Sequence, residues 1–467
     1  MNRYFIKKDV HVKYESGRCV LYIGELTDFC LSINREMMRL LSVVVTQSDE
    51  ENISANANHY FNIDPKYTSK LLQTLKPYLS HNDCNQNMQF ANELRATVLS
   101  AQNKTSNTVK KFDLKRFEHP LTLSIALTKS CGRKCVYCMA NAPYDRNNVL
   151  YPTMSLELFT KIINEARILN ISNVIISGGD ALTVKNIEDY IEIATQNKIE
   201  CFISTKYLVT KDKAKKLRYS GLNSIQVSLD SSDKTLADGL MGQIGAFDEV
   251  VQSIYNLKEA GFLITIRCVI MKQNIRNIPK FIIFCEQMGA DRITFNLYEN
   301  SCGRQDSKFF APAEDIFWLS KSIESIKQEC ENIIIDYSPS LFDFFISQRG
   351  LDQVGRHYYR GVCGAYKSSM IIREDGKVVY CEYLSELEET VIGDLNTSSI
   401  VEVWNSERYT NFSRPSKDLF TGTHCEMCEE FDACLNRRCY FRTKQAYGKL
   451  YDVDPMCKYG DVFFVRH

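Results

Sequence analysis

The sequence has no excess of charge of either sign, since its 57 lysines and arginines balance its 57 aspartates and glutamates. This balance excludes a global electrostatic attraction to nucleic acid or to anionic lipid. The sequence also lacks an apolar run of the roughly 18 residues that a membrane span needs. Its first residues, MNRYFIKKDVHVKYE, lack the apolar core of a signal peptide. We therefore expect a cytoplasmic protein with no membrane partner.

Histidine is scarce, with seven residues, and no Ser/His/Asp or paired-carboxylate arrangement stands out, so a conventional hydrolytic site has no support. Cysteine is abundant instead, with eighteen residues. In a reducing compartment, clustered cysteines indicate metal binding or catalysis rather than disulfides. The cysteines that occur singly are expected to be small buried apolar residues: Cys19, Cys30, Cys84, Cys201, Cys268, Cys285 and Cys330.

The first hundred residues predict a small α+β domain that resembles a winged helix. Three short strands are expected at 8–14, 18–24 and 28–34, followed by helices at 36–45 and from Asp64-Pro65 to about Leu79. Such a domain could bind DNA, but residues 1–90 hold ten basic and ten acidic side chains, so no nucleic-acid partner is expected. We place this domain at 1–100 and a polar linker at 101–119.

Residues 120–345 alternate short apolar strands with amphipathic helices, which is typical of a parallel sheet buried on both faces. The alternation fits either a partial barrel or an open doubly wound sheet, and in both folds ligands gather at the carboxyl ends of the strands. Strands are expected at 121–127, 173–177, 200–204, 224–229, 263–270 and 292–298. Helices are expected at 155–169, 186–197, 211–219, 247–260, 277–288 and 312–330.

Three cysteines, Cys131, Cys135 and Cys138, follow directly after the first of these strands. Three thiolates can ligate three irons of a four-iron cluster and leave the fourth iron open. A structural zinc site is the alternative, but it would need a fourth ligand, and no His or Cys follows at finger spacing.

This CxxxCxxC motif, with Tyr137 before its last cysteine, resembles that of the radical S-adenosylmethionine enzymes. The resemblance implies a partial (β/α)6 TIM-type barrel and a [4Fe-4S] cluster whose open iron chelates S-adenosylmethionine. Reductive cleavage would then yield a 5′-deoxyadenosyl radical that abstracts a substrate hydrogen. The expected cofactor contacts lie near the strand ends, with Arg267 as a partner for the carboxylate: Tyr137, Gly178, Gly179, Asp180, Ser204, Ser228, Asp230 and Arg267.

A second cysteine system lies in residues 346–467, expected to be a cysteine-rich and mostly irregular domain. Its spacing resembles the SPASM extension, which implies two auxiliary four-iron clusters and three clusters in all. One cluster would take Cys425, Cys428, Cys434 and Cys457, and the other Cys363, Cys381 and Cys439. Two zinc sites are the alternative.

The C-terminal segment departs from the SPASM pattern in two ways. The cysteine that many relatives have upstream of Cys363 is missing, so one iron of the cluster held by Cys363, Cys381 and Cys439 is either open or takes a distant ligand such as His357 or Cys302. The insert LNRR between Cys434 and Cys439 puts two cations beside a cluster, which should raise its potential.

The order of elements in residues 1–100 looks like the PqqD-like domains that bind a leader peptide as an added strand, although a purely structural extension is the alternative. The combined resemblance, to ribosomal-peptide maturases such as sactisynthases, implies an oxidoreductase that cross-links a precursor peptide. A cysteine-derived thioether of the sactipeptide or ranthipeptide type is expected first, and a carbon–carbon cross-link next. The electron donor would be a ferredoxin or flavodoxin. The rivals are an anaerobic sulfatase maturase and an iron–sulfur electron-transfer or regulatory protein.

Overall fold

In the computed structural model, the chain forms two compact units, Met1–Leu121 and Thr122–His467. We describe each unit separately. The residues that the structure describes are 4–6, 10–15, 18–23, 26–33, 40–41, 43–44, 49–61, 63–75, 78–80, 116–171, 173–298, 306–330, 332–337, 364–435, 438–455, 457 and 459–460.

The first unit holds a three-stranded antiparallel sheet in the order β2-β3-β4, and the three predicted strands are confirmed. The strands are β2 (Val10–Glu15), β3 (Arg18–Ile23) and β4 (Leu26–Ile33). Within the described residues, β2 and β4 each pair with β3 alone. The sheet therefore has two edges to which a further strand could add.

The helices of the first unit differ in part from the sequence prediction. Of the helix expected at 36–45, the residues Leu40, Leu41, Val43 and Val44 are described and are helical. Helix α2 (Glu50–Phe61) was not predicted. Helix α3 (Pro65–Leu75) begins at the expected proline but ends before Leu79. The reason is that β5 (Leu79–Ser80) pairs with β1 (Phe5–Ile6).

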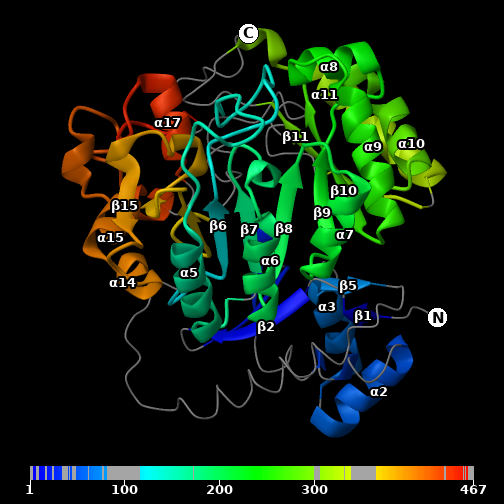
Figure 1. Ribbon diagram of the computed structural model, residues 1–467. Coiled ribbons are helices and arrows are strands. Elements are labelled where there is room, and N and C mark those ends of the chain that lie inside the picture. The colour runs from blue at the N-terminus through cyan, green and yellow to red at the C-terminus, as the bar shows by residue number, and fades with distance from the viewer. Residues whose placement is uncertain are drawn as a thin grey trace. The chain divides into compact units, whose positions relative to one another are not determined.

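The second unit is built on a ten-stranded sheet in the order β12-β11-β10-β9-β8-β7-β6-β13-β14-β15 (Figure 1). Strands β6 to β12 are parallel neighbours in chain order, without the reversal of a doubly wound sheet. The sheet order does not close, so the fold is a partial barrel. The six predicted strands are confirmed as β6 (Thr122–Ala126), β7 (Asn173–Ser177), β8 (Glu200–Thr205), β9 (Ser224–Ser228), β10 (Leu263–Ile270) and β11 (Arg292–Leu297).

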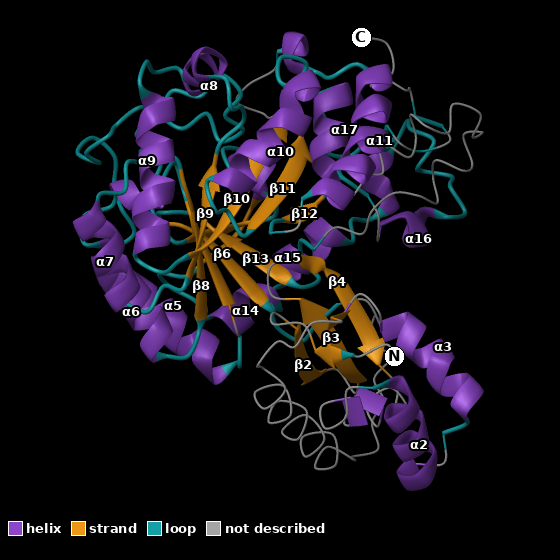
Figure 2. Ribbon diagram, turned by 90° about the vertical axis from the view of Figure 1, so that its right-hand side faces the viewer, coloured by secondary structure: helices purple, strands orange, loops and turns teal. Residues whose placement is uncertain are grey.

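The helices between these strands cover the outer side of the sheet, as Figure 2 shows for α5, α6, α7 and α9. Helix α5 begins at the cap Ser155, whose side chain accepts from the Leu158 amide, and it buries Phe159, Ile162, Ile163 and Ala166 at helical spacing. Helix α8 was not predicted. The helices are α5 (Leu156–Ile168), α6 (Ile187–Gln196), α7 (Lys211–Tyr219), α8 (Lys234–Met241), α9 (Ala246–Glu259), α10 (Ile278–Gln287) and α11 (Ala313–Glu329).

The two faces of the parallel strands differ, which corrects the expectation of a sheet buried on both sides. In β9, Ile225 and Val227 are buried in the core, whereas Ser224, Gln226 and Ser228 stay partly exposed. Strand β10 repeats the pattern, with Cys268 buried and Arg267 exposed. The inner face therefore carries polar side chains that protein atoms do not fully cover, and it can accommodate a ligand.

The C-terminal part has more regular structure than the sequence suggested. Strand β13 (Ser369–Ile372) pairs in parallel with β6 and extends the barrel sheet, and it continues into the antiparallel strands β14 (Lys377–Val379) and β15 (Val391–Asp394). The remaining elements are β12 (Ile334–Asp336), α14 (Ile400–Trp404), α15 (Glu407–Ser413), α16 (Phe431–Leu435) and α17 (Tyr440–Tyr447). In the part of the chain that the structure describes, no helix is long and apolar enough to cross a membrane.

Candidate cluster and cofactor sites

The three clustered cysteines lie on the loop that leaves β6, and we call residues 128–146 the cysteine loop. The Cys131 amide donates to the Pro143 carbonyl at 3.0 Å, and the Cys131 carbonyl accepts from the Asp145 amide at 2.9 Å. The amides of Lys134 and Val136 donate to the last carbonyls of helix α8. The loop is therefore held by its own continuation on one side and by α8 on the other.

Arg133 fixes the middle of the cysteine loop from within. The residue is 2% exposed, and its Nε donates to the Lys206 carbonyl at 3.1 Å. Its Nη2 contacts the Glu249 carboxylate at 2.6 Å, and Arg146 contacts the other oxygen of the same carboxylate at 2.9 Å. These contacts connect the cysteine loop to the end of β8 and to helix α9. Such support is what a ligand-bearing loop needs to keep its geometry.

The glycines after β7 allow that strand to approach the cysteine loop closely. A Cβ atom on Gly178 would lie 2.3 Å from the Thr128 carbonyl oxygen, and one on Gly179 would lie 2.1 Å from the Ser130 carbonyl oxygen. Gly178 also has a positive φ of 139°. The Gly179 amide donates to the Thr128 carbonyl at 2.8 Å. The close approach that the glycines permit is therefore to the cysteine loop itself, a role that the sequence did not indicate.

The Asp180 carboxylate is buried and accepts hydrogen bonds from its own protein. Its donors are the Leu182 amide, the Thr205 hydroxyl and the Lys206 amide, at 2.8 to 3.0 Å. Burial raises the pKa of Asp180, although these hydrogen bonds oppose the rise. In this structure the carboxylate ties β7 to β8. Its expected contact with the cofactor ammonium stays a prediction.

A buried polar cluster adjoins the cysteines. The Tyr137 hydroxyl donates to the Asp230 carboxylate, and the Lys206 ammonium donates to the same hydroxyl. The Lys206 Nζ lies 3.7 Å from Asp230 and 4.6 Å from the centre of the Tyr137 ring. Burial lowers the pKa of Lys206, but the charges of Cys135 and Asp230 outweigh it and raise the pKa. Lys206, which the sequence analysis did not select, is therefore a fixed cation beside the cysteines.

The donor set of the cysteine loop fits an iron–sulfur cluster. Cys135 is buried and the other two cysteines are half-buried. Burial, followed by the Asp180 charge, raises the pKa of the Cys131 thiol to about 12. In the described residues, no three His, Cys, Asp or Glu side chains converge as they would around one metal ion. Thiolates of a four-iron cluster each bind a different iron, so they need not converge on one point.

A row of polar side chains crosses the inner face of the barrel from β8 to β11. Gln226 donates to Ser204 at 2.6 Å and accepts from Arg267 at 3.1 Å. The other Arg267 nitrogen donates to Asn296, also at 3.1 Å. The sequence analysis selected Ser204 and Arg267 from this row, and it missed Gln226 and Asn296. Alternation along β9 places Ser228 on the same face as Gln226.

The C-terminal domain also approaches this region. The Glu382 side chain is close enough for the positive charge of Arg267 to favour the ionised form of its carboxyl. Glu382 follows Cys381 at the start of a short 3-10 helix (Glu382–Leu384). The inner face is therefore influenced by both halves of the second unit, which no local sequence pattern indicated.

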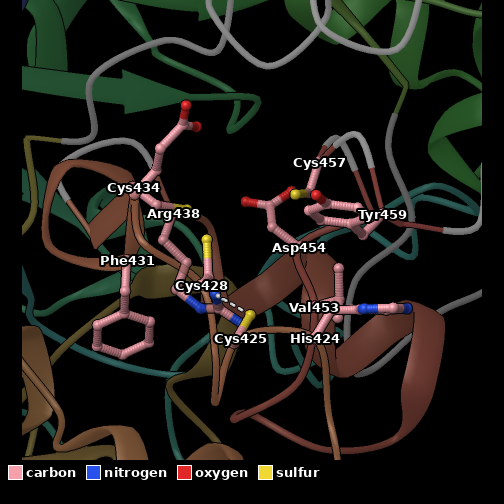
Figure 3. A pocket seen from close by; sticks show the side chains of 11 residues that line it. His424, Cys425, Cys428, Phe431, Cys434, Arg438, Val453, Asp454, Cys457 and Tyr459 are labelled. Atoms are coloured by element: carbon pink, nitrogen blue, oxygen red, sulfur yellow. Dashed lines mark hydrogen bonds between the residues drawn. The ribbon is translucent and has the colours of Figure 1, made fainter.

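Four of the C-terminal cysteines line one pocket, whose side chains Figure 3 shows. They are Cys425, Cys428, Cys434 and Cys457, the set expected to ligate one auxiliary cluster. Arg438 and Asp454 line the same pocket. Arg438 is 3% exposed, and its Nη1 lies 3.6 Å from the Cys425 sulfur. Four soft sulfur donors beside a buried cation fit an anionic iron–sulfur cluster.

The other expected auxiliary set is only partly described. Cys439 donates its amide to Asp454 at 3.2 Å, and Cys381 is half-buried against the main core. Cys363, together with the candidate fourth ligands His357 and Cys302, lies outside the described residues. Their assignment as ligands stays a prediction.

Comparison with known families gives two matches along the second unit. The model of the radical SAM superfamily matches residues 125–285. The model of an iron–sulfur cluster-binding domain, SPASM, matches residues 363–434. The two matched ranges contain the cysteine loop and most of the C-terminal pocket.

Relatives and solved structures extend this similarity. The chain is 24% identical to an AdoMet-dependent heme synthase of Methanosarcina barkeri, over 73% of this chain and 97% of the relative. It is 23% identical to a PqqA peptide cyclase of Granulibacter bethesdensis, over 73% and 87%. The fold resembles that of Streptococcus suis SuiB bound to precursor peptide SuiA, with a TM-score of 0.62, 19% identity and coverage of 97% and 99%. It also resembles anSMEcpe with bound AdoMet, with a TM-score of 0.52, 18% identity and coverage of 74% and 96%.

Proposed function

Since the chain contains a radical SAM domain and a SPASM domain, whose cofactors are [4Fe-4S] clusters and S-adenosylmethionine, we propose that it is a maturase of a ribosomally made peptide. It would remove a hydrogen from a residue of a precursor peptide and form a cross-link. A thioether from a cysteine sulfur to a carbon is the first candidate product, and a carbon–carbon bond is the second.

The observation that carries this proposal is the separate N-terminal unit. The alignment with SuiB covers 97% of the chain, whereas the heme synthase and PqqA cyclase relatives match 73%. Within its described residues the unit presents a three-stranded sheet with edges at β2 and β4. An extended leader peptide can add to such an edge through main-chain hydrogen bonds, while its alternate side chains give specificity.

The cofactors would be held at two places in the second unit. Cys131, Cys135 and Cys138 would ligate the radical-generating cluster, and the strand ends from Gly178 to Arg267 would contact S-adenosylmethionine. When bound, these groups supply a carbon-centred radical that abstracts hydrogen from the substrate. The four cysteines of the C-terminal pocket would ligate an auxiliary cluster, and Cys363, Cys381 and Cys439 another.

The protein residues would orient the reactants and keep water out. Arg133, Glu249 and Arg146 hold the cysteine loop against β8 and α9. The row of Ser204, Gln226, Arg267 and Asn296 presents fixed donors and acceptors on the inner face. A peptide lying along that face could hydrogen-bond to the row without rearranging it, which lowers the cost of positioning the reacting carbon.

The choice of a thioether depends on the auxiliary cluster with three matching cysteines. An iron without a fourth protein ligand could bind the cysteine thiolate of the substrate and fix its sulfur near the reacting carbon. A fourth ligand from His357 or Cys302 would remove this advantage and favour a carbon–carbon cross-link.

Other enzymatic reactions, and a role as an electron carrier, make different demands on the chain. The heme synthase relative and the anSMEcpe structure match 73% and 74% of the chain, so a porphyrin or sulfatase-type reaction accounts for less of the chain than the alignment with SuiB, which covers 97%. A simple electron carrier would not need the ordered row on the inner face. A ferredoxin or flavodoxin would supply electrons in either enzymatic case.

The test is an anaerobic reaction of the full chain with a precursor peptide encoded by a short neighbouring gene, with S-adenosylmethionine and a reductant. We expect 5′-deoxyadenosine and a peptide that is lighter by two hydrogen atoms per cross-link, assigned by fragment masses. The matched control is the same core peptide without its leader, which should bind more weakly and react slowly. Equal binding and reaction of the two peptides would contradict leader recognition. Oxidation of a sulfatase-derived peptide alone would favour the maturase of sulfatases.

A further inference from the structure

Arg438 occupies an unusual position for a cation. It lies between helices α16 and α17, directly before Cys439, and it is 3% exposed. Its Nη1 donates to the Cys425 sulfur at 3.6 Å, while the side-chain nitrogens Nε and Nη2 have no hydrogen-bond partner among the described residues. Figure 3 shows the side chain extending toward Cys425 and Cys428.

Burying an arginine side chain is costly. The guanidinium remains charged, and its five N–H donors, held in a fixed planar fork, lose their hydrogen bonds to water. The rings of Phe420 and Tyr440 lie 4.5 Å and 5.8 Å from the guanidinium carbon, and they compensate part of the cost. They cannot accept the in-plane hydrogen bonds of Nε and Nη2. The unsatisfied donors therefore indicate an acceptor that belongs in the pocket.

The pocket is lined by four cysteines and by the carboxylates Glu430 and Asp454. The Nε and Nη2 of Arg438 hydrogen-bond to neither carboxylate, whereas Nη1 donates to the Cys425 sulfur, so the side chain is directed at the cysteines. Cluster sulfurs accept N–H bonds, and such bonds together with the net local charge set the reduction potential.

We propose that Arg438 donates charge-assisted hydrogen bonds to the sulfurs of the auxiliary cluster held by Cys425, Cys428, Cys434 and Cys457, and that it thereby raises the potential of this cluster so that it accepts the electron released by cross-linking. The proposal rests on the proposed function. A carbon radical brings one electron and a thiolate two to the new carbon–sulfur bond, which holds two. The remaining electron reduces the oxidised cluster, and a one-electron carrier protein reoxidises it.

The sign of the effect follows from charge. Reduction adds a negative charge to the cluster, and a desolvated cation beside it stabilises the reduced form. Lys417 provides a matched control, because it also lies near the pocket but is exposed. It donates to the Cys428 carbonyl at 2.8 Å rather than to a sulfur. Solvent and salt screen its charge.

The experiment is a redox titration of the full chain, followed by electron paramagnetic resonance, in a background where Cys131, Cys135 and Cys138 are replaced by alanine. The signal of the pocket cluster is the one that disappears in Cys425→Ala. In Arg438→Gln and Arg438→Met, we expect the ratio of oxidised to reduced pocket cluster at a fixed potential to rise about tenfold, which is 59 mV for a one-electron couple. Arg438→Lys should show a smaller shift, and Lys417→Gln should stay close to the parent protein.

The possible results separate the alternatives. An unchanged potential in Arg438→Gln and Arg438→Met, with the iron content kept, would overturn the role of Arg438 while leaving the enzymatic function intact. Loss of the pocket cluster from these two variants but not from Arg438→Lys would support a requirement for the charge, and its loss from all three would indicate a packing role and overturn the proposal. If the parent protein shows no signal that depends on Cys425, the cluster assignment itself is wrong.

Discussion

The cysteine loop after β6 and the C-terminal pocket both gather cysteines, but the protein supports them differently. Around the loop, the polar groups of Arg133, Ser130 and Asp180 bond to other protein groups. In the pocket, the ring of Phe420 lies beside Arg438, which keeps two nitrogens without partners in the described residues. A site with satisfied polar groups can be preformed, whereas a site with unsatisfied donors is completed by its ligand. The four predictions that follow test this difference.

Replacing Cys131, Cys135 and Cys138 together with alanine should have the largest effect on activity. We expect loss of about four irons per chain, the content of one cluster, and no formation of 5′-deoxyadenosine. Because the loop is held by Arg133 and by backbone hydrogen bonds, the thermal unfolding of the second unit should change little. Iron analysis, product assay and calorimetry check this, and residual cofactor cleavage would contradict the assignment of the loop.

Removing iron with a chelator should distinguish the two cysteine systems directly. We expect amide exchange in residues 420–457 to accelerate roughly tenfold or more, because metal binding there contributes to folding. Exchange in the cysteine loop should change less. Hydrogen exchange followed by mass spectrometry measures both regions in one sample, with helix α6 as the internal control. Equal acceleration in the two regions would mean that neither site is preformed.

Gly179→Ala should disturb the cysteine loop through steric overlap. Its Cβ would lie 2.1 Å from the Ser130 carbonyl oxygen, so backbone must move, and we expect a cost of about 3 kcal/mol or more. Gly245→Ala is the control, because it has a positive φ of 83° but meets no atom within 4 Å. It should cost about 1–2 kcal/mol. Similar unfolding free energies for the two variants would contradict the packing explanation.

Arg133→Met should destabilise the loop more than Arg146→Met, although both arginines contact Glu249. Arg133 is buried and also holds the Lys206 carbonyl, so its loss should cost about 2–4 kcal/mol. The Arg146 side chain is 30% exposed, and its loss should cost roughly 1 kcal/mol or less. Denaturant unfolding and the iron content of the loop site check the difference. A larger loss of unfolding free energy in Arg146→Met than in Arg133→Met would show that Arg146 stabilises the loop more than Arg133 does.

Much of the barrel could be predicted from the sequence because its strands are short apolar runs and its helices show amphipathic spacing. The cysteine triplet is likewise a local pattern. The sequence could not indicate that β13 joins β6, because the pairing connects residues far apart in the chain. It missed α8 for a different reason, since KTLADGLM is short, contains Gly239 and is followed by Gly242, and these glycines could equally mark a loop.

Among the site residues, too, the sequence indicated those that belong to a local pattern and missed those that depend on contacts between distant segments. Ser204 and Arg267 were found through their places on strands, but their partners Gln226 and Asn296 become visible only when parallel strands set them side by side. Arg438 was visible as part of an inserted string, and its burial against Phe420 was not. Lys206 had a signal, since a lysine directly after a barrel strand is costly to bury without a partner.

The pairing of β13 with β6 has a consequence for how this protein can be divided. The strand that carries the cysteine loop is an interior strand only because the C-terminal domain covers its outer edge. A fragment that ended before Ser369 would present β6 as an unprotected apolar edge, which is a template for pairing with other chains. The barrel and the cluster domain therefore belong to one compact unit, and exchanging the C-terminal domain for that of another protein would require the pairing of β13 with β6 to be kept.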